Sequence, residues 1–135
     1  MMTAVTEKNF AQEVLDSSVP VLVHFRAPWC GICRLIAPVL TQFQTEWPVP
    51  IKLFDVNADE NFKLANQYQL STLPTLLYIE SGRIIHRLEG FASRDDFSSK
   101  LEGIAARYRL ENVYPFGSAI GERQISAATQ SERNR

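Results

Sequence analysis

Helical and strand-like patterns of apolar residues alternate along most of this chain. Apolar side chains recur at helical spacing in four segments, while apolar runs rich in β-branched and aromatic residues mark four strands. The strands are expected at residues 20–25, 51–56, 75–80 and 83–89, and the helices at residues 6–18, 33–47, 59–68 and 93–108. Ser81-Gly82 is expected to form a two-residue hairpin turn, and Asp59 and Ser93 are expected to cap the last two helices. After the first helix the order is βαβαββα, which predicts an α/β fold with helices on both faces of a mixed sheet.

The pattern fades near residue 110, so we expect one domain at residues 1–109 and a C-terminal extension at residues 110–135. The extension is rich in Ser, Ala, Gln and Arg and has no sustained period, which favours a flexible tail. The aromatic cluster from Tyr114 to Gly117 leaves a second interpretation, in which the extension docks on the domain.

Composition and charge exclude several classes of protein. The chain is 45% hydrophobic and 21% charged, as an ordinary soluble domain is. Its net charge of −1 gives no electrostatic reason to expect nucleic acid or a membrane surface as a partner. No apolar run approaches the roughly 18 residues that span a bilayer, and the N-terminus lacks the basic start and apolar stretch of a signal peptide. We therefore expect a cytoplasmic protein.

The two cysteines of the chain, Cys30 and Cys33, are the main candidates for catalytic residues. They lie between the first predicted strand and the long helix. In the reducing cytoplasm a lone Cys-x-x-Cys pair is more often catalytic than structural. Because the N-terminus of a helix stabilises a thiolate, Cys30 is expected to be the nucleophile. Cys33, one turn further in, is expected to resolve a mixed disulfide.

Two other uses of the pair stay open at this point. One is a structural disulfide, although a bond that closes so short a loop removes little unfolded-state entropy. The other is a zinc site, which needs about four ligands and has only His24 and His86 to add to the cysteines.

The order of elements and the segment from Trp29 to Arg34, which reads Trp-Cys-Gly-Ile-Cys-Arg, resemble the thioredoxin family. Further stretches match that family in the expected order: Val21 to Phe25, Ile36-Ala37-Pro38, Leu73-Pro74-Thr75-Leu76 and Gly90. The resemblance implies the thioredoxin fold and disulfide exchange with other proteins in cell redox homeostasis. It requires neither a bound cofactor nor a metal.

The resemblance also implies a substrate-binding surface around the cysteines. In the family, the proline that matches Pro74 is cis and faces the cysteine pair. The glycine that matches Gly90 lies in a shallow apolar groove that receives the substrate. The residues expected to form this surface are Trp29, Gly31, Ile32, Leu73, Pro74, Gly90 and Phe91.

The chain departs from the typical family pattern beside the cysteines. Ile32 stands in place of a proline, and His24 in place of a buried aspartate whose accompanying lysine falls at Leu53. A buried neutral imidazole can accept a proton, so we hypothesise that His24 serves as the proton acceptor for Cys33. The alternative is a core histidine bonded to a backbone carbonyl.

Two arginines are candidates for tuning the redox potential. Arg26 replaces an aromatic residue and shares a strand face with His24, and Arg34 follows the second cysteine. Nearby cations, and the loss of the buried carboxylate, stabilise a thiolate, which predicts a midpoint less negative than that of typical thioredoxins. Solvated surface charge is the alternative for both arginines.

The sequence therefore predicts a monomeric protein-disulfide reductase that a thioredoxin reductase or another thiol donor regenerates. A disulfide isomerase or oxidase is one alternative, which a less negative midpoint would suit. The other is a redox-sensing or chaperone-like binding module with little turnover.

Overall fold

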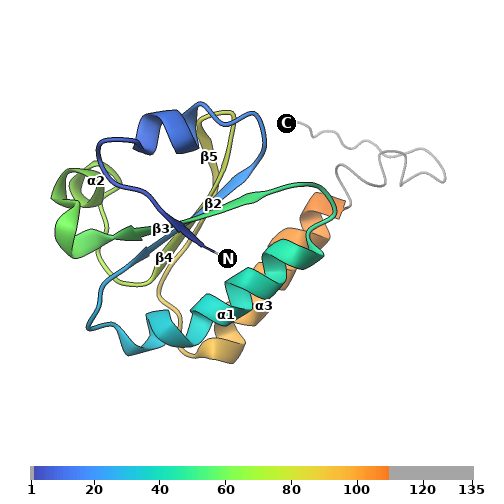
Figure 1. Ribbon diagram of the computed structural model, residues 1–135. Helices are drawn as coiled ribbons and strands as arrows, with labels where there is room; N and C mark the ends of the chain where they lie inside the picture. Colours follow the sequence, from blue (N-terminus) through green and yellow to red (C-terminus); the bar gives the residue numbers. More distant parts are fainter. Residues whose placement is uncertain (1, 110–135) are drawn as a thin grey trace. The chain divides into compact units, whose positions relative to one another are not determined.

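A computed structural model describes residues 2–109 of the chain (Figure 1). The predictions for residues 110–135, including the docking of the aromatic cluster, lie outside the described residues. The chain divides into two compact units, and the boundary between them follows Ser99, within the last helix. The elements are, in order, β1 (Thr3–Ala4), η1 (Ala11–Leu15), β2 (Val21–Arg26), α1 (Gly31–Glu46), β3 (Lys52–Asn57), η2 (Ala58–Glu60), α2 (Phe62–Gln67), β4 (Thr75–Glu80), β5 (Arg83–Leu88) and α3 (Arg94–Tyr108).

The strands form one mixed sheet in the order β1-β3-β2-β4-β5. Strand β3 pairs in parallel with both β1 and β2, whereas β4 pairs antiparallel with β2 and with β5. Strand β2 is therefore central, and it leads directly to the cysteines. Its residues are nearly all buried, as a strand covered on both faces requires.

The two faces of β2 have different surroundings. Val21, Val23 and Phe25 pack with side chains of η1 and α2 in one apolar core. Leu22, His24 and Arg26 alternate with them and face the other side of the sheet, where α1 runs (Figure 1). Buried side chains of α1 recur at helical spacing, namely Cys33, Ile36, Leu40 and Phe43. The predicted α/β architecture, with helices on both faces of a mixed sheet, is confirmed.

The N-terminal region differs from the prediction. The expected helix at residues 6–18 is instead a short π-helical segment, η1, whose Asp16 N–H donates to the Ala11 carbonyl. The strand β1 was not predicted, because two residues are too few to show an apolar period. Strand β1 pairs with β3 and forms one edge of the sheet.

Three local predictions concern one hairpin turn and two N-caps. In the β4–β5 hairpin, Ser81 and Gly82 both have positive φ, 52° and 78°, as the expected two-residue turn requires. Ser93 caps α3 as predicted, since its Oγ accepts from the Asp96 N–H at 3.1 Å. Asn57, rather than the predicted Asp59, caps the turn before α2, and its Oδ1 accepts from the Asp59 N–H at 2.9 Å.

Within residues 2–109, no helix combines the length and the apolar character that crossing a bilayer requires.

Candidate active site: the Cys30–Cys33 pair

Cys30 is the N-cap of α1, where the tight turn after β2 ends. Its backbone N–H donates to the Ala27 carbonyl, and its φ and ψ of −86° and 103° are non-helical, as an N-cap requires. The Sγ of Cys30 accepts from the Cys33 N–H at 3.2 Å. Helix N-terminal N–H groups and the helix dipole both favour negative charge at this sulfur. The predicted position of Cys30 at the start of the helix is confirmed.

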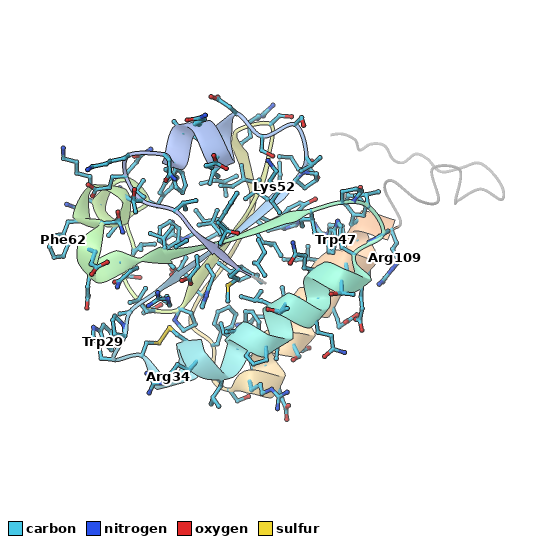
Figure 2. All side chains as sticks on the ribbon, in the orientation of Figure 1. Trp29, Arg34, Trp47, Lys52, Phe62 and Arg109 are labelled. Carbon is cyan, nitrogen blue, oxygen red and sulfur yellow. A yellow bond between two sulfur atoms is a disulfide. The ribbon has the colours of Figure 1, made fainter. Side chains whose placement is uncertain are left out.

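The two cysteines form a disulfide, with their Cα atoms 5.3 Å apart. Figure 2 shows this bond between the labelled Trp29 and Arg34. Both cysteines are nearly inaccessible, with exposed fractions of 4% for Cys30 and 1% for Cys33. Ile32 and Leu73 pack against them. Within residues 2–109, no cluster of three or more His, Cys, Asp and Glu side chains is arranged to hold a metal ion.

The loop before β4 lies beside the disulfide. The Leu73–Pro74 peptide bond is cis, and Leu73 contacts the cysteine cluster. Thr75, which follows, is fully buried, and its hydroxyl donates to the Thr72 carbonyl at 2.8 Å. The structure thus brings the predicted cis-proline segment to the cysteines.

Trp29 presents a large apolar surface next to the disulfide. Its side chain is 68% exposed (Figure 2), and its Nε1 donates to the Asp59 carboxylate at 3.0 Å. An exposed aromatic ring held by a hydrogen bond can contact a partner at little entropic cost. Gly31, the first residue of α1, follows directly after Cys30.

Gly90 and Phe91 follow β5. Gly90 has φ of 69°, a conformation that side chains disfavour, and space for a Cβ is open there. The Phe91 ring packs edge-on against Phe97, with ring centroids 4.7 Å apart. The predicted substrate contacts of Gly90 and Phe91 stay predictions.

A pocket of about 240 Å³ lies behind the disulfide, beneath the start of α1. It is lined by polar side chains from β2, β3 and α1, and by a few small or apolar ones. Cys33 is the cysteine that reaches it. The full lining is Met2, His24, Arg26, Ala27, Pro28, Cys33, Arg34, Ala37 and Asp55.

His24 has no access to solvent, with an exposed fraction of 0%. Within the described residues, neither of its ring nitrogens has a hydrogen bond. The Nδ1 atom lies 3.3 Å from Asp55 Oδ1, which is an ion-pair distance without hydrogen-bond alignment. The alternative of a histidine bonded to a backbone carbonyl is therefore wrong.

Asp55 is a site residue that the sequence interpretation missed. It pairs with His24 across the β2–β3 ladder, whereas Leu53, where the sequence placed the accompanying residue, pairs with Leu22. The site therefore holds a carboxylate on β3, beside the β2 position where the family resemblance implied one. The signal in the sequence was a lone acidic residue inside the apolar run at residues 51–56.

Asp55 also neutralises Arg26. The guanidinium Nε donates to Asp55 Oδ2 at 2.7 Å. Burial pushes the pKa of Asp55 upward, but the neighbouring His24 and Arg26 side chains outweigh it and hold the pKa below its ordinary value of 3.8. Asp55 is therefore ionised at neutral pH.

Arg34 lies at the mouth of the same pocket. Its Nη1 donates to the Pro28 carbonyl at 2.6 Å, so it spans the turn that carries Trp29 and Cys30. Within residues 2–109, no carboxylate is bonded to Arg34, whereas Arg26 is paired with Asp55. The positive charge of Arg34 is thus less compensated.

Comparison with known proteins agrees with this geometry. The sequence model of the thioredoxin family matches residues 1–103. The chain belongs to the thioredoxin family. Thioredoxin 1 of Nostoc sp. is 44% identical over 98 residues, which cover 73% of this chain and 92% of the relative. Thioredoxin 1 of Synechococcus elongatus is 40% identical over 99 residues, with the same two coverages. The chloroplastic M-type thioredoxin of Chlamydomonas reinhardtii is 42% identical over 80 residues, 59% of this chain and 57% of that protein.

The thioredoxin fold and the close cysteine pair together make this chain a thiol–disulfide oxidoreductase of the protein-disulfide reductase type. As in other thioredoxins, its substrates are protein disulfides and its partners include a reductase. His24 and Asp55 both line the pocket that Cys33 reaches.

Proposed function

We propose that this thioredoxin reduces disulfides in cytoplasmic proteins, with Cys30 as the nucleophile and Cys33 as the resolving thiol. The observation that carries this assignment is the position of Cys30 as the N-cap of α1, with its sulfur accepting the Cys33 N–H. A thiolate at that sulfur is stabilised by the helix terminus, and thiolate is the attacking species. Cys33 is more enclosed and contacts the pocket, which suits a thiol that reacts second.

The reaction proceeds in two exchanges. The Cys30 thiolate attacks one sulfur of the substrate disulfide, and a substrate thiolate leaves with the bonding electrons. Cys33 then loses its proton and attacks Cys30, which releases the second substrate thiol and closes the Cys30–Cys33 disulfide. Two electrons pass to the substrate, and an external dithiol must return them. A thioredoxin reductase or another thiol donor supplies them.

The substrate is proposed to bind across the surface made by Trp29, Gly31, Ile32, Leu73, Pro74, Gly90 and Phe91. The exposed Trp29 ring and the packing of Ile32 and Leu73 on the cysteines support this surface. The backbone beside Pro74 can pair with an extended substrate segment, as in strand addition. A monomer suffices for this chemistry, because one chain contributes both cysteines.

We further propose His24 as the proton acceptor for Cys33, and Arg26 and Arg34 as residues that tune the potential. Burial of His24 in the pocket that Cys33 lines supports the first role. For the second, the ion pair with Asp55 leaves Arg26 with less effect on the sulfurs than Arg34 has.

A trapping experiment tests the assignment of the two cysteines. In Cys33→Ser, substrate proteins are expected to stay covalently attached to Cys30 and to be released by dithiothreitol. In Cys30→Ser, no such adducts are expected, since the nucleophile is gone. Adducts that form equally with both variants would contradict the order of attack.

Insulin reduction distinguishes the proposed reductase from a binding module. Wild-type protein with dithiothreitol is expected to precipitate the insulin B chain faster than dithiothreitol alone. Supplying NADPH and a thioredoxin reductase in place of dithiothreitol then tests the proposed electron donor. An isomerase or oxidase would instead refold scrambled, disulfide-containing substrates faster than it reduces insulin.

A further inference from the structure

His24 is an unusual buried group, because it is polar, fully buried and, within residues 2–109, without a hydrogen bond. In native proteins, buried polar atoms nearly always have partners, so an exception calls for a physical reason. Its Nε2 has no partner within the described residues, and its ring lines the pocket that Cys33 also lines. His24 and the resolving cysteine therefore line the same small, partly open pocket.

The other ring nitrogen of His24 faces a fixed carboxylate. Asp55 Oδ1 lies 3.3 Å from Nδ1, and Asp55 Oδ2 is held by Arg26 at 2.7 Å. A neutral imidazole donates from one nitrogen and accepts on the other. With its proton on Nδ1, towards Asp55, the imidazole has its lone pair on Nε2.

The charged and titratable groups around this imidazole come from three elements. Arg26 is on β2 with His24, Asp55 is on β3, and Arg34 and Cys33 are on α1. On its other side, β4 places the apolar Leu76 opposite His24. Asp55 is thus the one carboxylate among the residues that line the pocket.

We propose that Asp55 is a positioning residue for the resolving step, which orients His24 so that Nε2 removes the proton of the Cys33 thiol. This inference rests on the proposed function, since it assigns the proton of the second exchange. Cys33, His24 and Asp55 then follow the arrangement of nucleophile, base and orienting carboxylate. The 3.3 Å contact belongs to the oxidised state, and such contacts commonly shorten when the proton moves.

The resolving step transfers one proton and exchanges one disulfide bond. The proton leaves Cys33 Sγ for His24 Nε2, and the Asp55 carboxylate stabilises the imidazolium that forms. The Cys33 thiolate bonds to Cys30 Sγ, and the bond from Cys30 to the substrate sulfur breaks. The substrate thiolate leaves with that electron pair, and the imidazolium returns its proton to the thiolate or to water through the pocket.

A single-turnover reaction with dithio-bis(nitrobenzoate) separates the two exchanges. Attack by Cys30 releases the first coloured thiolate, and attack by Cys33 on the mixed disulfide releases the second. The variants are Asp55→Asn, Asp55→Glu, His24→Gln and the double variant of Asp55→Asn with His24→Gln. The control is Glu80→Gln, which removes a carboxylate bonded to Tyr78 at the opposite end of β4.

Asp55→Asn is expected to slow the second release at pH 7 by about 10-fold, which is less than the full contribution of a general base. The rate of the first release should change less than about twofold. His24→Gln is expected to slow the second release at least as much. The double variant should be no slower than His24→Gln, because Asp55 acts through His24. Asp55→Glu should recover part of the rate, and Glu80→Gln should match wild type.

The pH profile gives a readout that a purely structural role would not move. In Asp55→Asn, the second release is expected to rise about 10-fold per pH unit towards the ordinary thiol pKa of about 8.5, as for an unassisted thiol. The wild-type rate should vary less over the same range. A second release that is unchanged in Asp55→Asn, whether or not His24→Gln slows it, or rate losses that multiply in the double variant, would overturn the inference.

A failure of the proposed function would give a different result in the same experiment. If Cys30 gives no fast first release in wild type, the assignment of the nucleophile itself is wrong. If Asp55→Asn does not fold, then His24→Gln and Asp55→Glu decide the question, and wild-type second-release rates in both refute the role of Asp55.

Discussion

Arg26, Asp55 and His24 contact one another across β2 and β3, in the pocket that the resolving cysteine also lines. Strand alternation predicted that His24 and Arg26 share a face, which the pocket lining confirms. It did not predict Asp55, because the partner across a sheet depends on strand register, and one sequence does not fix register. The expected loss of a buried carboxylate is therefore wrong, and that part of the argument for a less negative midpoint fails.

The ion pairs of Asp55 predict a stability that depends on pH. Since the folded-state pKa of Asp55 lies below its ordinary value of 3.8, the stabilisation is present above that value and is lost as the pH falls through the folded pKa. Asp55→Asn is expected to lower the free energy of unfolding of the oxidised protein by on the order of 1–3 kcal/mol at pH 7. Urea unfolding at pH 7 and at pH 3.5 measures this, and the deficit should shrink at the lower pH. An equal deficit at both values would show that the carboxylate charge is not responsible.

Arg34 is expected to shift the redox midpoint. Its guanidinium is bonded to the Pro28 carbonyl, in the turn that leads to Cys30, whereas that of Arg26 is bonded to a carboxylate. Removing a cation destabilises the thiolate and hence the reduced form, so Arg34→Ala should make the midpoint more negative, by about 10 mV for an exposed charge. Equilibration with glutathione at fixed pH measures the midpoint, and Arg26→Ala provides the comparison. A shift towards less negative values in Arg34→Ala would contradict the proposed tuning.

At the scale of elements, the positions that short-range chemistry controls were predicted correctly. The Ser81-Gly82 turn and the Ser93 cap depend on residues adjacent in sequence, and both are as predicted. Errors concern elements that depend on distant partners. The segment η1 packs on the sheet through Val14, and β1 exists only because β3 pairs with it.

The β4–β5 turn predicts the cost of a side chain at Gly82. Its φ is +78°, and a Cβ there would lie 3.2 Å from the Leu15 carbonyl oxygen. Gly82→Ala is expected to lower the free energy of unfolding by about 1–2 kcal/mol, the usual cost of a left-handed residue. The matched control is Gly103→Ala within α3, where a Cβ meets open space. That variant should instead stabilise by about 0.5–1 kcal/mol, and equal effects of the two substitutions in thermal unfolding would refute the role of the turn.

At the scale of the whole molecule, two different residues are candidates for the end of the folded domain. The sequence pattern ends the domain at residue 109, just past α3, whereas compactness divides the chain after Ser99. All the proposed site residues lie between His24 and Phe91, and the family match extends to residue 103. The position of the boundary therefore leaves the site intact, but it decides how much of α3 belongs to the domain. Leu101 and Ile104 are buried, and each buried side chain of this size contributes about 1.5–3 kcal/mol.

Truncation distinguishes these boundaries. A chain that ends at residue 109 retains all of α3, so it is expected to unfold cooperatively and to reduce insulin within about twofold of the full-length rate, because the sequence of residues 110–135 lacks the apolar periodicity of a core element. A chain that ends at Ser99 loses two buried aliphatic side chains from α3 and should be unfolded or strongly destabilised, because a domain has only about 5–15 kcal/mol of total stability. Circular dichroism during thermal unfolding and the insulin assay measure both chains. If the shorter chain folded and turned over as well as the longer one, the domain would end at Ser99, whereas loss of activity in the longer chain would assign a role to residues 110–135.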